Sequence, residues 1–153
     1  AMMPQVKTVK FHGALYNDAN VDAELAKLLV GWMTKKGIKE VVTFSDSELA
    51  TEARKTGLKV ICEAYAERNY SYNPQKKQLT LVSRTRDYAS IKDCNEAIKH
   101  ATKIIREAKV AAYIEDAEGK IARIEVPIKA ETICIHSDSR ISLKLAKTLA
   151  GLL

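Results

Sequence analysis

Residues 10–17 read Lys-Phe-His-Gly-Ala-Leu-Tyr-Asn, directly after the apolar start Val6-Lys7-Thr8-Val9. The apolar residues predict a strand over 6–11, and the octapeptide puts a cation, an imidazole and an amide at its C-terminal end: Lys10, His12 and Asn17. In α/β folds, ligands bind at the C-terminal ends of parallel strands. The stretch therefore predicts an α/β fold and a candidate site. The alternative is a strand-to-helix turn whose polar residues are incidental.

The first half of the chain alternates between helix and strand patterns. A helix is predicted from an N-cap at Asn20 to a stop at Gly37, and a second from a capping box at Ser45 and Glu48 to Gly57. Strands are predicted over 38–44 and 58–65. A β-α-β-α-β order predicts parallel strands joined by right-handed crossovers.

The second half is less regular. Between 66 and 88 the pattern lapses into turn-rich sequence with a short extended piece at 79–82. Helices are then predicted over 91–108 and 139–152, and strands over 110–114, 121–128 and 132–135. The turn Asp116–Gly119 has the composition of a hairpin connection. We predict one α/β domain over residues 1–153.

Composition narrows the classes of function. The chain has 153 residues and a net charge of +6, but its Lys and Arg residues are spread along the sequence. Nucleic-acid binding usually requires them to cluster, so none is predicted. No apolar run approaches the roughly 20 residues that span a bilayer, so no membrane association is predicted. Three cysteines without a C-x-x-C spacing indicate a reducing, cytoplasmic setting.

Two further strand ends carry polar residues like those of the first. One is Glu63 with the following Glu67-Arg68-Asn69-Tyr70, and the other is His136-Ser137-Asp138. If the strands are parallel neighbours, these groups meet on one rim. A histidine could then act as general base or acid, while Lys and Arg hold anionic oxygens.

Each of these signals has a structural alternative. Residues 136–138 could cap the last helix through Ser137 or Asp138, and Arg68 and Arg84 could pair with nearby carboxylates. His100, inside a helix, is predicted to face solvent. No ligand spacing supports a metal site, and no nucleotide-binding glycine motif is present.

Four segments together resemble the LamB/YcsF family, whose members are also called 5-oxoprolinase A subunits. Residues 10–17 resemble its Lys-Pro-His-Gly-Ala-Leu-Tyr-Asn motif, and residues 63–70 its Glu-x-Phe-Ala-Asp-Arg-x-Tyr stretch. Residues 81–84 and 133–138 resemble its Leu-Val-Pro-Arg and Ile-Cys-Val-His-Gly-Asp segments. The four matches follow the family's order and cover nearly the whole chain.

The resemblance implies an irregular TIM-like (β/α) barrel, similar to that of polysaccharide deacetylases. It implies ATP-dependent opening of the lactam 5-oxoproline to glutamate, with partner subunits B and C and ATP as the cofactor. The residues it places in the site are Lys10, His12 and Asp138 as catalytic residues and Asn17, Arg68, Arg84 and His136 as substrate-binding residues. Among these, we assign proton transfer to His12. The alternative is a non-catalytic relative that binds a ligand or a partner.

The chain also departs from the family pattern. The family's two N-terminal strand motifs are absent, so we expect a partial barrel that lacks the first two strands. Open sheet edges are rarely left uncovered. The sequence could be a fragment of a longer protein, it could pair with a separate N-terminal chain, or it could self-associate; we favour self-association and predict a homo-oligomer. Within the matching segments, the family's residues are replaced by Phe11, Glu67, Ser83 and Ser137.

Overall fold

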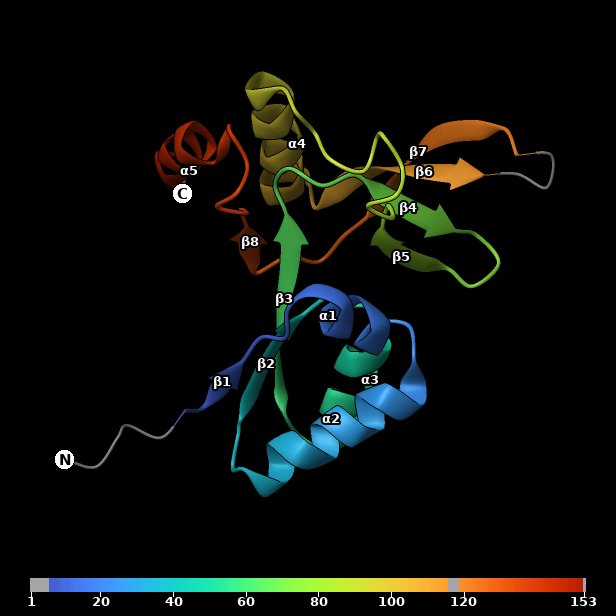
Figure 1. Ribbon diagram of the computed structural model, residues 1–153, viewed down its shortest axis with the longest axis vertical. Coiled ribbons are helices and arrows are strands. Elements are labelled where there is room, and N and C mark those ends of the chain that lie inside the picture. The colour runs from blue at the N-terminus through green and yellow to red at the C-terminus, as the bar shows by residue number, and fades with distance from the viewer. Residues whose placement is uncertain (1–5, 116–118, 153) are drawn as a thin grey trace. The chain divides into compact units, whose positions relative to one another are not determined.

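The computed structural model describes residues 6–115 and 119–152 (Figure 1). The chain divides into two compact units, Ala1–Glu63 and Ala64–Leu153, and the division falls within a strand. We describe each unit by itself. The prediction of a single domain over 1–153 stays a prediction. Residues 116–118 of the predicted hairpin turn lie outside the described residues.

The first unit consists of parallel strands and three helices. β1 pairs with β2 and β2 with β3, both in parallel, with Thr8 opposite Glu40 and Glu40 opposite Lys59. The predicted parallel start is therefore confirmed. In order, the elements are β1 (Thr8–Val9), α1 (Gly13–Ala19), α2 (Ala23–Lys35), β2 (Glu40–Thr43), α3 (Glu48–Lys55) and β3 (Lys59–Tyr65).

Both predicted helix starts in this unit are wrong. Asn20 follows the short helix α1, and its buried side chain accepts a hydrogen bond from Thr43 Oγ1 at 2.7 Å. The N-cap of α2 is Asp22, which accepts from the Glu24 and Leu25 amides. The N-cap of α3 is Ser47, which accepts from the Ala50 amide, so Ser45 caps nothing. An N-cap needs an extended backbone followed by helical residues, and composition alone does not fix that position.

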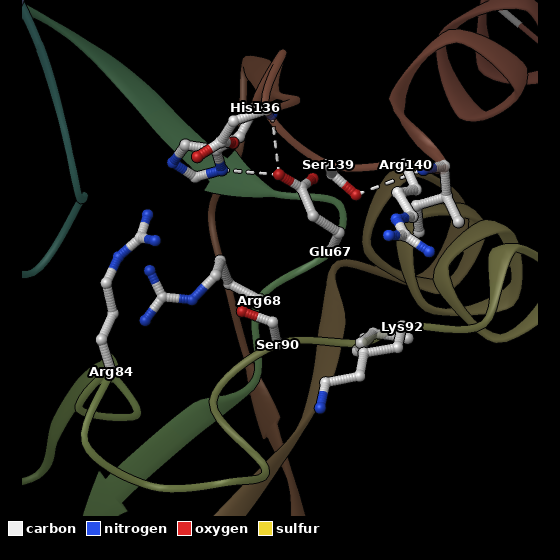
Figure 2. Close-up of a pocket in the computed structure, with 11 residues that line it drawn as sticks. Glu67, Arg68, Arg84, Ser90, Lys92, His136, Ser139 and Arg140 are labelled. Atoms are coloured by element: carbon white, nitrogen blue, oxygen red, sulfur yellow. Dashed lines mark hydrogen bonds and ion pairs between the residues drawn. The ribbon is translucent and has the colours of Figure 1, made fainter.

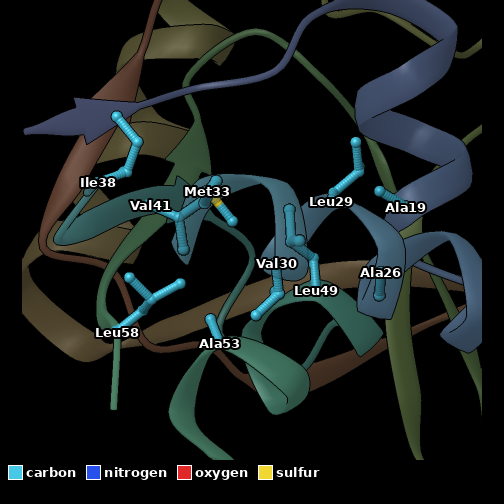
Figure 3. Close-up of a cluster of buried hydrophobic side chains, with 10 residues drawn as sticks. All are labelled: Ala19, Ala26, Leu29, Val30, Met33, Ile38, Val41, Leu49, Ala53 and Leu58. Carbon is cyan, nitrogen blue, oxygen red and sulfur yellow. The ribbon is translucent and has the colours of Figure 1, made fainter. Parts of the chain in front are cut away.

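The predicted helix ends are correct. Gly37 and Gly57 follow α2 and α3 with φ of 72° and 78°, a conformation that glycine adopts without a Cβ penalty. The helices then bury their apolar faces in one core (Figure 3). Its residues are Ala19, Ala26, Leu29, Val30, Met33, Ile38, Val41, Leu49, Ala53 and Leu58.

The second unit contains a mixed sheet and two helices. Its strand order is β5-β4-β6-β7, in which β4 is antiparallel to β5 and parallel to β6, and β6 is antiparallel to β7. In order, the elements after β3 are β4 (Tyr70–Asn73), β5 (Gln78–Leu81), α4 (Cys94–Glu107), β6 (Lys109–Glu115), β7 (Ile121–Pro127), β8 (Thr132–Cys134) and α5 (Ser142–Ala150).

Two details of this unit differ from the sequence prediction. Where the pattern lapsed, β4 and β5 form a hairpin with Tyr70 opposite Leu81. The last helix begins at Ser142, after Ile141 as N-cap, so neither Ser137 nor Asp138 caps it. The pairing of β6 with β7 confirms the predicted hairpin strands.

The core of the second unit lies where α4 meets α5. It includes Ala97, Ala101, Leu145 and Leu149, all buried. Beside it, the Ala66 amide donates to Cys134 O at 3.0 Å, which holds β8 next to the segment that follows β3. The fold is therefore mixed α/β with parallel and mixed sheets. Within the described residues, no helix is both long and apolar enough to cross a membrane.

Candidate functional site

The predicted residues of the first strand end lie in the first unit. The Lys10 ammonium forms an ion pair with Glu63 Oε1 of β3, and the Glu63 side chain is 3% exposed. His12 is the N-cap residue of α1 without a side-chain cap bond, and Asn17 lies within α1; both are exposed. A buried carboxylate thus fixes the lysine, while the imidazole and the amide face solvent.

A carboxylate–imidazole pair lies in the second unit. Glu67 is buried, and its Oε1 accepts from the His136 amide at 2.7 Å and contacts His136 Nδ1 at 2.5 Å (Figure 2). The His136 ring also stacks on Tyr65, with centroids 5.4 Å apart. Since a carboxylate only accepts hydrogen bonds, Nδ1 carries the proton, and Nε2 of the neutral ring is an acceptor. Glu67 therefore fixes both the orientation and the tautomer of His136.

Arg68 is buried next to Glu67 in the sequence. Its Nε donates to Ala89 O at 3.1 Å and its Nη2 to Val82 O at 2.7 Å. Burial lowers the pKa of Arg68, and the positive charge of Arg84 acts in the same direction. Among the residues that the structure describes, Arg68 therefore forms no ion pair with a carboxylate, which was the structural alternative. Two carbonyls hold its guanidinium, and a second guanidinium lies near it.

These residues line one pocket of about 510 Å³. Figure 2 shows the guanidinium groups of Arg68 and Arg84 turned toward each other, with the Glu67–His136 pair in the same view. Four cationic side chains line the pocket: Arg68, Arg84, Lys92 and Arg140. Two like charges held close together are stabilised by an anion between them, so the lining favours an anionic ligand.

The pocket brings together four of the residues that the family resemblance placed in the site: Arg68, Arg84, His136 and Asp138. The convergence of Lys10, His12 and Asn17 on the same rim stays a prediction. Lys92 and Arg140 were missed because neither stands at a strand end nor in a motif. The Glu67–His136 contact joins residues 69 positions apart, which only the chain's topology brings together.

His100 does not face solvent as predicted. Its ring stacks on Tyr70 with centroids 5.7 Å apart, and its Nε2 is buried. Among residues 6–115 and 119–152, no three His, Cys, Asp or Glu side chains gather closely enough to hold a metal ion.

The fold and this pocket define a class: a mixed α/β protein in which a pocket lined by cationic side chains contains a histidine held by a carboxylate. The chain belongs to the LamB/YcsF family, whose family model matches residues 1–153.

Relatives named as the A subunit of 5-oxoprolinase share about a third of its residues. The one from Clostridium beijerinckii is 36% identical over 151 residues, covering 95% of this chain and 52% of the relative. The one from Coprothermobacter proteolyticus is 35% identical over 147 residues, covering 95% and 51%. The chain spans about half the length of the curated relatives it matches.

A solved structure has a similar fold. It is the lactam utilization protein of Thermus thermophilus, with a TM-score of 0.71 and 31% sequence identity. The match covers 95% of this chain and 54% of that one.

Proposed function

We propose that this chain is a subunit of an ATP-dependent 5-oxoprolinase-type hydrolase, which opens the cyclic amide of 5-oxoproline to give glutamate. Family membership supports the proposal, as do the relatives named as the A subunit of 5-oxoprolinase. The observation that carries it is the Glu67–His136 pair in a pocket that also contains Arg68 and Arg84. Hydrolysis of an amide needs a general base that takes a proton from the attacking water. The carboxylate of 5-oxoproline also needs a cationic side chain that binds it.

In this proposal, His136 is the proton-transfer residue. Its Nδ1–H donates to Glu67, so Nε2 can accept a proton from the water that attacks the lactam carbonyl carbon, and can then return it to the leaving nitrogen. The sequence assigned this step to His12. The hydrogen-bonded carboxylate supports His136 instead, because it stabilises the imidazolium that forms. His12, Lys10 and Asn17 remain proposed site residues, and so does Asp138.

Arg84 and Arg68 would bind anionic oxygens. Arg84 is exposed, and its planar guanidinium suits two-point contact with the substrate carboxylate. Arg68 keeps its orientation through Ala89 O and Val82 O. The same cationic lining, with Lys92 and Arg140, fits the phosphate oxygens of ATP, which when bound would activate the amide oxygen toward attack.

Subunits B and C are the proposed partners, and the proposed architecture is a partial, irregular TIM-like barrel that forms a homo-oligomer. The second candidate function is a non-catalytic module that binds a ligand or a partner. It is favoured by Lys10, whose ammonium is already engaged by the buried Glu63.

The test is reconstitution of the chain with subunits B and C, followed by measurement of 5-oxoproline-dependent ATP hydrolysis and glutamate release. We expect His136→Gln to lower the rate by roughly 100-fold or more, because general-base catalysis is lost. Glu67→Gln should lower it by roughly tenfold or more, since an amide does not hold the tautomer. Glu24→Gln, at an exposed ion pair with Lys27, is the matched control.

A mixture without lactam-dependent hydrolysis, or one in which His136→Gln keeps the full rate, would refute the catalytic proposal. If hydrolysis is absent but 5-oxoproline still raises the melting temperature of the chain, the non-catalytic binding module is supported instead.

A further inference from the structure

The second unit has another cavity, of about 590 Å³, that contains none of the residues proposed above for proton transfer or for binding the substrate carboxylate. Its walls come from α4, β6, β7 and the segment 87–93. It shares Ser90, Ile91 and Lys92 with the first pocket. Its volume is in the range of small-molecule sites, and the chemistry of its lining is distinctive.

Two residues of its lining, Asn69 and His100, each have a buried polar atom that lacks a hydrogen-bond partner within the described residues: Asn69 Oδ1 and His100 Nε2. Asn69 is 6% exposed, and its Nδ2 donates to Tyr88 O at 2.8 Å, which leaves Oδ1 as the unpaired acceptor. A buried polar group without a partner destabilises the fold, because it has lost its hydrogen bonds to water. A ligand with hydrogen-bond donors would satisfy these acceptors.

The tautomer of His100 makes its free nitrogen an acceptor as well. The ring hydrogen-bonds to the Tyr65 backbone, and since Nε2 has no partner, Nδ1–H is the donor. Burial lowers the pKa of His100 to about 4, and the positive charge of Arg123 acts in the same direction. At neutral pH, Nε2 is therefore unprotonated and, like Asn69 Oδ1, needs an N–H or O–H donor.

The same cavity presents a cation on an aromatic wall. The Arg123 guanidinium lies 4.7 Å from the centroid of the Tyr113 ring, and the Tyr88 ring is 4.7 Å from Tyr113. Within the described part of the chain, Arg123 makes no ion pair, whereas Lys103 of the same lining is paired with Glu125. The stacking fixes the orientation of Arg123, and its N–H groups remain suited to a carboxylate.

We propose that this cavity is a second ligand site, for a small carboxylate that also carries an N–H donor. The carboxylate binds Arg123, and the donor satisfies Asn69 Oδ1 and His100 Nε2. Two kinds of compound have this chemistry: a free amino acid, whose ammonium group has enough N–H donors for both acceptors, and a lactam acid, whose single amide N–H can serve one of them. The site does not rest on the proposed hydrolase function, because it uses different residues.

The test follows the ring nitrogens of the whole chain by ¹⁵N NMR during titration with glycine, with 5-oxoproline and with acetate. The chain has three histidines, so His12→Gln and His136→Gln assign the His100 signals. We expect glycine or 5-oxoproline to shift the His100 Nε2 resonance in a saturable manner, because Nε2 becomes hydrogen-bonded. Which of the two probes acts identifies the source of the donor. Acetate has no N–H and should leave the resonance in place.

Two matched variants separate the cavities. Arg123→Gln should raise the dissociation constant of the active probe roughly tenfold or more, as expected for a lost charge-assisted contact. Arg84→Gln, in the first pocket, should leave it unchanged. The proposal is wrong if neither probe moves the His100 resonance, if acetate moves it equally, or if the response depends on Arg84 rather than Arg123. None of these results tests the proposed hydrolase function, which is tested separately by the effect of His136→Gln on the rate of hydrolysis.

Discussion

Glu67, Arg68 and Asn69 are three consecutive buried polar residues, an arrangement that is costly unless each side chain is paired. The segment pairs with residues 89–91: Asn69 N donates to Ala89 O, and Ile91 N to Glu67 O. Because of this pairing, Glu67 and Arg68 line the first pocket, while Asn69 lines the second cavity. The three polar side chains therefore line cavities on two sides of one short segment.

Burial of His100 predicts that the free energy of unfolding depends on pH. Its pKa is about 4 in the folded chain against 6.5 in the unfolded chain. Between these values the unfolded state binds more protons, so the free energy of unfolding falls as the pH is lowered from 6.5 to 4. This difference of about 2.5 pKa units corresponds to a loss of about 3 kcal/mol. In His100→Gln, we expect the free energy of unfolding no longer to show this decrease between pH 6.5 and pH 4.

The pH dependence of the free energy of unfolding is measured by urea denaturation at a series of pH values between 4 and 7. The slope against pH is the readout, so an overall loss of stability in the variant does not obscure the result. His12→Gln is the control, because it removes an imidazole from an exposed position. Equal slopes for His100→Gln and the unmodified chain would contradict the prediction.

At the scale of elements, helix caps show what the sequence could and could not predict. Asn20, Asp22, Ser45 and Ser47 are all good N-cap residues, so composition offers two candidates for each helix. The choice depends on tertiary contacts. Asn20 is used as an acceptor for Thr43 Oγ1. The C-terminal ends of α2 and α3 were predictable, because the residue after each helix has a positive φ that glycine adopts without strain.

Ser45 and Ser47 therefore form a matched pair. Ser47→Ala removes the acceptor for the Ala50 amide, and we expect the free energy of unfolding to fall by about 1 kcal/mol. Ser45→Ala removes only a hydroxyl that donates to the Asp46 carboxylate, and should change it by less than about 0.5 kcal/mol. Urea unfolding of both variants shows which of the two serines is the N-cap of α3. A larger loss for Ser45→Ala would restore the cap position predicted from sequence.

The site was predictable to the extent that its residues follow strands. His136 and Asp138 follow β8, and Arg68 follows β3, so strand ends located them. The hairpin β4–β5 was missed because Tyr70–Asn73 has turn-forming residues, and its partner strand supplies the missing stability. The Glu67–His136 contact and the second cavity depend on how separate elements pack, which periodicity does not encode.

At the scale of the whole molecule, the chain divides into two units that each have a buried core. The first core contains Leu49 and the second Leu145, and both side chains are fully buried. Leu→Ala at such positions costs about 2–5 kcal/mol. The two substitutions therefore perturb one core each by a comparable amount, which allows the predicted single domain to be tested.

The single tryptophan of the chain, Trp32, lies in α2 and reports on the first unit. If residues 1–153 form one cooperative domain, Leu145→Ala must lower the urea midpoint seen by Trp32 fluorescence, by roughly 1 M, although the change is in the other unit. Far-UV circular dichroism should then give the same midpoint. Leu49→Ala, within the unit that contains Trp32, must lower the fluorescence midpoint in any case and is the control. A fluorescence midpoint that ignores Leu145→Ala, while circular dichroism shows an earlier transition, would mean that the two units unfold as separate domains.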